Sequence, residues 1–297
     1  MEPSPIEPIQ RPGIRAWIDT SSPFASVLES RLGEIASVPD GFTPIRTRSH
    51  SRRLWEGTLD GIPSPLILKQ RWLNPSYGLS RRISCRVSLA LENPFRQALE
   101  IAPRLAAAGI AAIRPILCWK RFLHHVPVEE GILYPKFDSS MSLHHYLVGR
   151  PSGPSRVTTL QVHLPRETLS ALGRFLRALN AAGFVHVDPA PHNILVRAGA
   201  PLPPTETSFA LIDVEAFRPL PSNRPDAPCS RYARAMAVSP LLPYLPPDDL
   251  APFGEAFALD TESPDAWLRV FTWLRRHPNP RPLSRLRLFL RTLAFRP

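Results

Sequence analysis

The chain has 297 residues, of which 43% are hydrophobic, enough to build one large domain or two modest ones. It has no run of eighteen apolar residues, and its first thirty residues lack a basic stretch followed by an apolar one, so we predict a cytoplasmic protein without a transmembrane helix or a secretory signal. The formal charge of +11 favours anionic partners, and three widely separated cysteines argue against both a disulfide framework and a zinc site.

The first half of the chain has the pattern of a small sheet with few helices. Because its first residues contain several prolines, we predict a flexible N-terminal arm over residues 1–23. Apolar residues at helical spacing predict a short helix over 24–35. Three β-favouring stretches separated by turn residues then predict an antiparallel sheet; they cover residues 42–46, 53–59 and 65–72.

The rest of the chain is mostly helical, with short strands between the helices. A helix over 93–108 is expected to end at Gly109, and leucines along one face predict a long helix over 165–180. Further strands are expected at 113–119, 131–137, 184–186, 194–196 and 209–212, and further helices at 141–148, 266–275 and 282–295. This order predicts two lobes, with the sheet in the first and most of the helices in the second.

The densest polar cluster follows the long helix, where residues 186–193 read HVDPAPHN. This stretch matches H-x-D-x-x-x-x-N, the catalytic-loop pattern of kinases. In such a loop Asp188 can accept the proton of an attacking hydroxyl, and Asn193 can bind a metal ion near the phosphates. We expect His186 to be a structural hydrogen-bonding residue and His192 to face solvent.

A second carboxylate, Asp213, comes directly after the apolar stretch 209–212. An aspartate at this place can join Asn193 as an oxygen ligand of Mg²⁺. Val214 and Glu215 follow it where regulated protein kinases have Phe-Gly, so we do not expect their activation switch.

Upstream, residues 65–69 read PLILK and end in Lys69, which can bind the phosphates of a nucleotide as a point charge. The expected carboxylate partner is Glu100 on the helix 93–108, with Glu92 as the fallback. The loop that covers the phosphates should lie between the first two strands of the sheet. No G-x-G-x-x-G occurs there, and we place the tip of the loop at Ser49, His50 and Ser51.

These motifs, in this order, resemble the lipopolysaccharide kinase (Kdo/WaaP) family within the protein-kinase-like superfamily. The resemblance covers about residues 42–217 and includes LILK at 66–69, AAGIAAIRP at 107–115, YPKF at 134–137, GFVHVD at 183–188 and NILV at 193–196. It implies an α+β, protein-kinase-like two-lobed fold, with a small antiparallel-sheet N-lobe containing one helix over 24–134 and a mainly helical C-lobe over 135–297. Tyr134 and Phe137 would then form the nucleotide-binding hinge. Ala190 departs from the lysine common in protein kinases.

The family resemblance implies a kinase that moves the γ-phosphoryl group of ATP, with Mg²⁺, to a hydroxyl of a sugar or glycolipid such as Kdo or heptose. Separately, the arginines in 46–53, 81–86 and 275–291 are interpreted as a solvated basic surface, which could also make peripheral contact with an anionic inner-membrane surface. Two alternatives stay open: a phosphotransferase for small molecules of the aminoglycoside or choline type, and a pseudokinase scaffold without turnover. Nucleic-acid binding is not expected, since the sequence has no motif for it beyond net charge.

Overall fold

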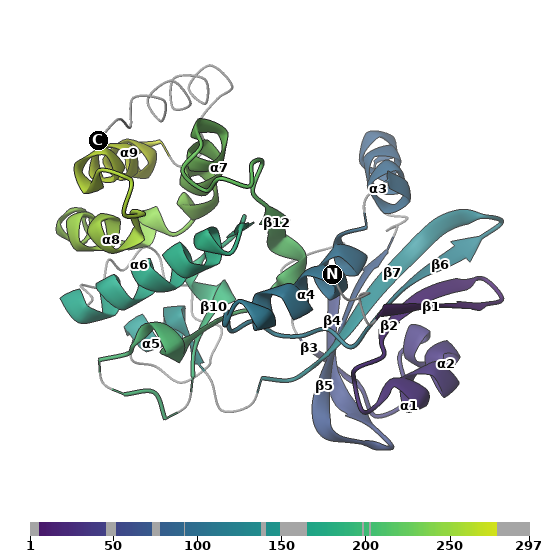
Figure 1. Cartoon of the computed structure of the whole chain (residues 1–297). Helices are drawn as coiled ribbons and strands as arrows, with labels where there is room; N and C mark the ends of the chain where they lie inside the picture. Colours follow the sequence, from purple (N-terminus) through teal and green to yellow (C-terminus); the bar gives the residue numbers. More distant parts are fainter. Residues whose placement is uncertain are drawn as a thin grey trace. The chain divides into compact units, whose positions relative to one another are not determined.

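The computed structural model describes residues 6–45, 52–72, 78–91, 93–137, 141–148, 165–197, 199–201 and 203–277 (Figure 1). The chain divides into two compact units. Unit 1 comprises Met1–Arg104 and Ile113–Asp138, and unit 2 comprises Leu105–Ala112 and Ser139–Pro297. Within the described part of the chain, no helix is both long and apolar enough to cross a bilayer.

Unit 1 is built on one antiparallel sheet with the strand order β1-β2-β6-β7-β5-β4-β3. Its strands are β1 (Ile6–Arg11), β2 (Ile14–Asp19), β3 (Thr43–Ile45), β4 (Arg52–Leu59), β5 (Ile62–Trp72), β6 (Leu117–Leu123) and β7 (Val126–Pro135). The three strands predicted between residues 42 and 72 correspond to β3, β4 and β5. The strand predicted at 113–119 is shifted, because β6 begins at Leu117.

The flexible arm predicted for residues 1–23 is wrong from residue 6 onward, because β1 and β2 form a hairpin there. The β2 strand continues into the sheet by pairing with β6, with Trp17 opposite Cys118. Pro8 lies in β1, the edge strand of the sheet, and edge strands are where sheets accommodate proline. The hairpin therefore widens the sheet of unit 1 rather than lying loose.

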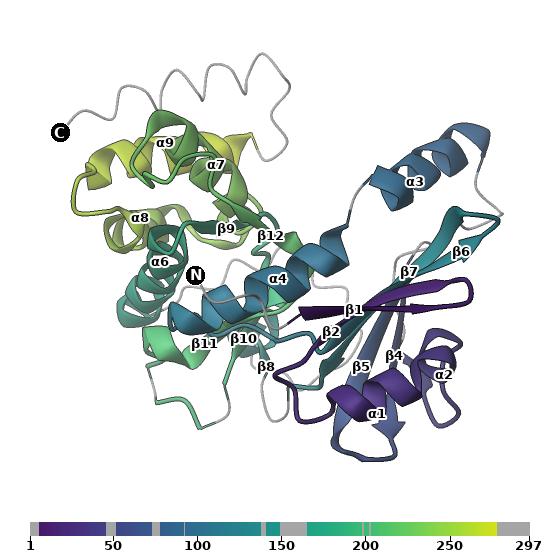
Figure 2. The same ribbon diagram turned by 45° about the vertical axis from the view of Figure 1, so that its right-hand side comes forward.

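The two faces of this sheet carry different helices. The helix predicted over 24–35 is broken at Arg31 into α1 (Ala25–Ser30) and α2 (Leu32–Ala36). Both pack on one face, where Leu28, Leu32 and Ile35 join Leu66 and other buried residues in an apolar core. The other face carries α3 (Leu79–Leu91) and α4 (Pro94–Ala107), as Figure 2 shows.

The helix α3 was not predicted from the sequence. It packs against β7. It is also bound to β6, since the Lys120 ammonium donates to the backbone carbonyl of Leu89 at 2.6 Å. The helix α4 matches the prediction over 93–108 within one residue at each end and keeps Pro103 inside it.

Unit 2 is mainly helical, with short strand pairs between the helices. Its helices are α5 (Leu143–Val148), α6 (Arg166–Ala181), α7 (Pro228–Val238), α8 (Leu250–Phe257) and α9 (Pro264–Arg276). Its strands are β8 (Met141–Ser142), β9 (Phe184–His186), β10 (Ile194–Val196), β11 (Phe209–Leu211) and β12 (Phe217–Pro219). The helix predicted at 282–295 lies outside the described residues.

A buried ion pair joins the C-terminal helices of unit 2. Arg234 on α7 and Glu262 before α9 are both fully buried, and the guanidinium donates to Oε1 of Glu262 at 2.7 Å. The other carboxylate oxygen accepts from the indole of Trp267 at 2.9 Å and from the backbone of Leu259 at 3.0 Å. The guanidinium also lies 5.0 Å from the ring centre of Phe257. These hydrogen bonds between the guanidinium, the carboxylate and the indole hold the three segments in register.

Candidate functional site

Two strand pairs hold the loop of residues 187–193 in unit 2. Before the loop, β9 pairs with β12, with His186 opposite Phe217. After it, β10 pairs with β11, with Ile194 opposite Leu211. A single 3-10 turn (Pro191–Asn193) ends the loop and starts β10. Both ends of the loop are therefore fixed by backbone hydrogen bonds.

His186 is a buried structural residue, in line with the interpretation of the sequence. Its Nε2 lies 2.8 Å from the carbonyl oxygen of Ile212, and its Nδ1 accepts from the backbone N–H of Asp188 at 3.3 Å. These two bonds require the neutral imidazole with its proton on Nε2. Burial lowers the pKa of His186, although its bond to Ile212 opposes that shift. The ring therefore joins the loop to the strand that leads to Asp213.

Asn193 holds Asp188 in place. Its side-chain nitrogen donates to the backbone carbonyl of Asp188 at 2.9 Å and to the carboxylate Oδ2 at 3.1 Å. Asn193 is buried, whereas Asp188 is partly exposed. Because the nitrogen is used in this way, the side-chain oxygen of Asn193 is the atom suited to a metal ligand.

Asp213 lies one residue beyond the backbone bond that joins its strand to Asn193, in which Ile212 donates to the carbonyl of Asn193 at 3.0 Å. Its backbone is left-handed, with φ 58° and ψ 51°, and it starts the 3-10 turn Val214–Ala216. Left-handed backbone is uncommon for residues other than glycine, but aspartate and asparagine adopt it most readily. Asn193 and Asp213 thus come together through the pairing of two short strands.

Lys69 lies in the middle of β5 in unit 1, opposite Leu54 on β4 and Ile132 on β7. Its side chain is 3% exposed, which is unusual for a lysine. Since side chains alternate along a strand and Leu68 belongs to the apolar core under α1 and α2, Lys69 points to the opposite face.

Glu100 lies over the face of the sheet that carries Lys69. On α4 it accepts from Arg96 at 2.7 Å, and both side chains are close enough to Cys118 to affect its thiol. Burial is the largest cause that raises the pKa of Cys118, with smaller effects from Glu130 and Glu100. Cys118 is opposite Ile132, which is opposite Lys69, so these three side chains share one face. The Lys69–Glu100 pair itself stays a prediction.

A buried charged row lies next to Lys69 and was missed by the sequence analysis. The Glu130 carboxylate on β7 is 2.5 Å from the Arg71 guanidinium and 3.7 Å from the Lys120 ammonium. Burial lowers the pKa of Lys120. These residues come from three strands, so only their register brings them together.

Two histidines of α5 were also missed. His144 and His145 lie 5.8 Å apart between ring centres, and the Ser142 hydroxyl is 2.8 Å from Nδ1 of His145. Burial lowers the pKa of His144, and the charges of His145 and His192 lower it further. His192 belongs to the loop of residues 187–193, so α5 lies beside that loop. No local sequence signal joins residues so far apart in the chain.

Tyr134 and Phe137, the predicted hinge residues, lie at and just after the end of β7. Tyr134 is opposite Ile67 of β5. Between them, Lys136 donates its backbone N–H to Pro65 at 2.8 Å. The predicted loop tip at Ser49, His50 and Ser51 lies outside the described residues, as does the fallback Glu92.

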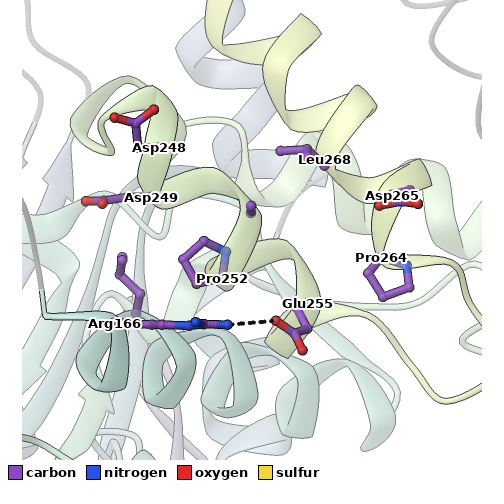
Figure 3. Close-up of a pocket in the computed structure, with 10 residues that line it drawn as sticks. Arg166, Asp248, Asp249, Pro252, Glu255, Pro264, Asp265 and Leu268 are labelled. Carbon is purple, nitrogen blue, oxygen red and sulfur yellow. Dashed lines mark ion pairs between the residues drawn. The ribbon is translucent and has the colours of Figure 1, made fainter.

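A cavity of about 610 Å³ in unit 2 is lined by none of the predicted site residues (Figure 3). It lies at the start of α6, where Arg166 is 3.6 Å from Glu255 of α8, and Asp248 and Asp265 add negative charge to its wall. The loop of residues 187–193 follows the other end of α6, about 23 Å away along the helix. This acidic cavity is therefore separate from that loop.

The chemistry of the residues at the loop 187–193 fits a Mg²⁺ ion. Among the described residues, no group of three or more His, Cys, Asp or Glu side chains is arranged to hold a metal. Asn193 and Asp213 would instead supply one amide oxygen and one carboxylate, a donor set that suits an ion that keeps several waters. Lys69, on its own unit, would supply a cation for the phosphates of ATP.

Comparison with known proteins supports the family resemblance. Residues 85–224 match the lipopolysaccharide kinase (Kdo/WaaP) family, which confirms the resemblance seen in the sequence. The solved structure of WaaP in complex with acyl carrier protein aligns with a TM-score of 0.55 and 16% identity, covering 86% of this chain and 95% of that one. The PknI kinase domain of Mycobacterium tuberculosis aligns with a TM-score of 0.39 and 16% identity, covering 80% and 96%. No curated protein matches the sequence. The predicted α+β, protein-kinase-like fold is confirmed.

Proposed function

We propose that this chain, whose residues 85–224 match the lipopolysaccharide kinase (Kdo/WaaP) family, transfers the γ-phosphoryl group of ATP to a hydroxyl of a sugar or glycolipid. The observation that carries the proposal is the bonding of Asn193 to both the backbone and the carboxylate of Asp188. This bonding fixes a carboxylate beside a metal-ligating amide, as phosphoryl transfer requires.

Each residue has a separate role in this proposal. Asp188 accepts the proton of the acceptor hydroxyl, and Asn193 and Asp213 hold the metal. Lys69 binds the phosphates, and Glu100 positions Lys69. Bound Mg²⁺ would neutralise charge that develops on the phosphate oxygens. His186 has no chemical step and keeps the loop in place through its two hydrogen bonds.

The acceptor is proposed to be anionic rather than cationic. The net charge of +11 favours an anionic acceptor such as a Kdo- or heptose-containing core glycolipid. An acidic pocket would favour an aminoglycoside or choline, but the acidic cavity lies about one length of α6 from the catalytic loop. We therefore place small cationic alcohols second. Cytoplasmic location with peripheral membrane contact is part of the same proposal.

The test uses the purified full chain with labelled ATP, Mg²⁺ and a panel of acceptors: core glycolipids, Kdo, heptose, an aminoglycoside, choline and a basic protein. We expect label on a glycolipid or its sugar, with the rate lowered about 10²–10⁴-fold by Asp188→Asn. His192→Gln is the matched control, because His192 is an exposed residue of the same loop and should keep most of the activity.

The panel also separates the alternatives. Label on the aminoglycoside or choline alone would show that the chain is a phosphotransferase for small molecules. If wild type and Asp188→Asn show the same background on every acceptor, the chain is a scaffold and the proposed activity is wrong.

A further inference from the structure

The helix α3 of unit 1 has an apolar stripe on its solvent face. Leu79, Ile83 and Val87 are 73%, 54% and 49% exposed. Residues four apart in a helix lie on the same side, so these three side chains form one continuous row. A single exposed aliphatic residue needs no explanation, but a row of three along one helix does.

Basic residues accompany this stripe. Arg86 is exposed and Arg82 is partly exposed, and both lie along one edge of the row. The described acidic side chains of unit 1 lie on other elements, and α3 itself has no acidic residue. The exposed side of α3 therefore combines aliphatic side chains with positive charge.

The helix is held so that this side faces outward. Another side of the helix carries Leu89, which is 1% exposed and whose carbonyl accepts from Lys120 of β6 at 2.6 Å. The helix also packs against β7, the strand that begins at Val126. Figures 1 and 2 show α3 beside the β6–β7 hairpin in both views. At the turn of that hairpin Leu123 and Val126 are 61% and 44% exposed, which adds a second apolar contact point on the same unit.

We propose that α3 is a membrane-docking helix, whose stripe of Leu79, Ile83 and Val87 enters the interface of an anionic lipid bilayer while Arg82 and Arg86 bind lipid phosphates. Helices of this composition lie in the plane of the interface, and each basic residue near an anionic surface strengthens binding. The net charge of +11 acts in the same direction.

The charges favour a bilayer over a second copy of the chain. In a two-fold contact through α3, each copy would present the same patch to the other. Arg82 and Arg86 would then face a surface with the same positive charge, and no acidic residue of α3 would offset it. An anionic bilayer offers apolar acyl chains to the aliphatic row and negatively charged phosphates to the arginines.

The test is co-sedimentation of the full chain with vesicles in the absence of ATP, so that docking and kinase activity can fail separately. One set of vesicles contains phosphatidylcholine alone, and the other contains phosphatidylglycerol as well. We expect binding to the second set, lowered at least about ten-fold by Ile83→Glu and about ten-fold by Arg86→Glu.

Two controls match these variants in unit 2. Met141→Glu changes an exposed apolar residue of similar exposure, 51% against 54% for Ile83. Arg269→Glu reverses an exposed arginine on α9 and alters the net charge as much as Arg86→Glu does. We expect each control to change binding less than about two-fold, because electrostatic attraction falls off within a Debye length.

Three results would overturn the inference. The first is that wild type does not co-sediment with the vesicles that contain phosphatidylglycerol. The second is equal loss of binding in Arg86→Glu and Arg269→Glu, which would show diffuse charge attraction. The third is a wild-type dimer in sedimentation velocity that Ile83→Glu converts to monomer, which would assign the stripe to a second copy. Thermal unfolding of each variant checks that loss of binding is not loss of fold.

Discussion

The side-chain nitrogen of Asn193 donates to both the backbone carbonyl and the carboxylate of Asp188, at 2.9 and 3.1 Å. One buried amide thus sets the position of the loop backbone and the direction of the carboxylate together. The strand that follows Asn193 pairs with the strand that leads to Asp213. Four expected outcomes follow from this arrangement and from the packing around it.

Replacing Asn193 with alanine should lower both stability and metal affinity. The loss of two hydrogen bonds to a buried residue is expected to cost about 1–3 kcal/mol in the free energy of unfolding. The Mg²⁺ concentration for half-maximal phosphoryl transfer should also rise, because one oxygen ligand is removed. Denaturant unfolding and a Mg²⁺ titration of activity measure the two effects. Asn180→Ala, at a buried asparagine of α6, is the control and should lower stability alone.

Asp213 combines a left-handed backbone with a carboxylate, and two substitutions separate these properties. Asp213→Asn should fold as well as wild type, because asparagine tolerates φ 58°, yet lose Mg²⁺-dependent activity. Asp213→Ala should lose activity too and, in addition, about 1 kcal/mol of stability. Equal unfolding free energies for the two variants would contradict the backbone argument. An active Asp213→Asn would contradict the metal role.

Stability should fall in acid partly because of His186. Its pKa is lowered in the folded state, chiefly by burial, whereas the unfolded chain takes up the proton near pH 6.5. Below that pH the unfolded state binds more protons, so the free energy of unfolding should fall, by at most about 1.4 kcal/mol per pH unit from this group. Above pH 6.5 the contribution is constant.

The measurement compares unfolding of wild type and His186→Asn from pH 8 to pH 5. The variant should be less stable at pH 8, because it loses the bond to Ile212, and its stability should depend less on pH. His144 has the same direction of shift in both proteins and cancels in the difference. Parallel pH curves would show that His186 does not titrate as argued.

The buried pair of Arg234 and Glu262 should be important for the stability of unit 2. Glu262→Gln keeps the shape of the side chain but leaves the guanidinium without its charged partner, at a cost of about 3–5 kcal/mol. The matched control is Glu206→Gln, whose pair with Arg174 at 3.2 Å is half-exposed and should cost less than about 1 kcal/mol. Chemical denaturation of both variants checks the difference. Similar small losses would mean that the buried pair is worth little.

Local patterns in the sequence were enough to find the helices α4, α6 and α9, the strands β3, β4 and β5, and the loop around Asp188. These features depend on residues close together in the chain, such as the leucine row of α6 and the HVDPAPHN stretch. The family resemblance drew on the same local motifs in their order, and the family match confirms it. Asp213 was likewise found because it directly follows an apolar strand.

The sequence alone failed where the outcome depended on pairing between distant segments. The hairpin of residues 6–19 was taken for a flexible arm, since its prolines weaken the strand signal and β6, which stabilises it, lies far along the chain. The charges of Arg71, Lys120 and Glu130 are brought together by the register of three strands.

The sequence by itself determined which side chains are proposed for phosphoryl transfer and predicted the type of element on which Lys69, Glu100, Asp188 and Asp213 lie. Tertiary structure decided which of them are buried, which hydrogen bonds hold them and which faces remain exposed. The bonds of His186 and Asn193 and the outward stripe of α3 belong to this second group. The physical reason is that local propensity acts over a few residues, whereas burial and register depend on contacts that form only when the whole unit folds.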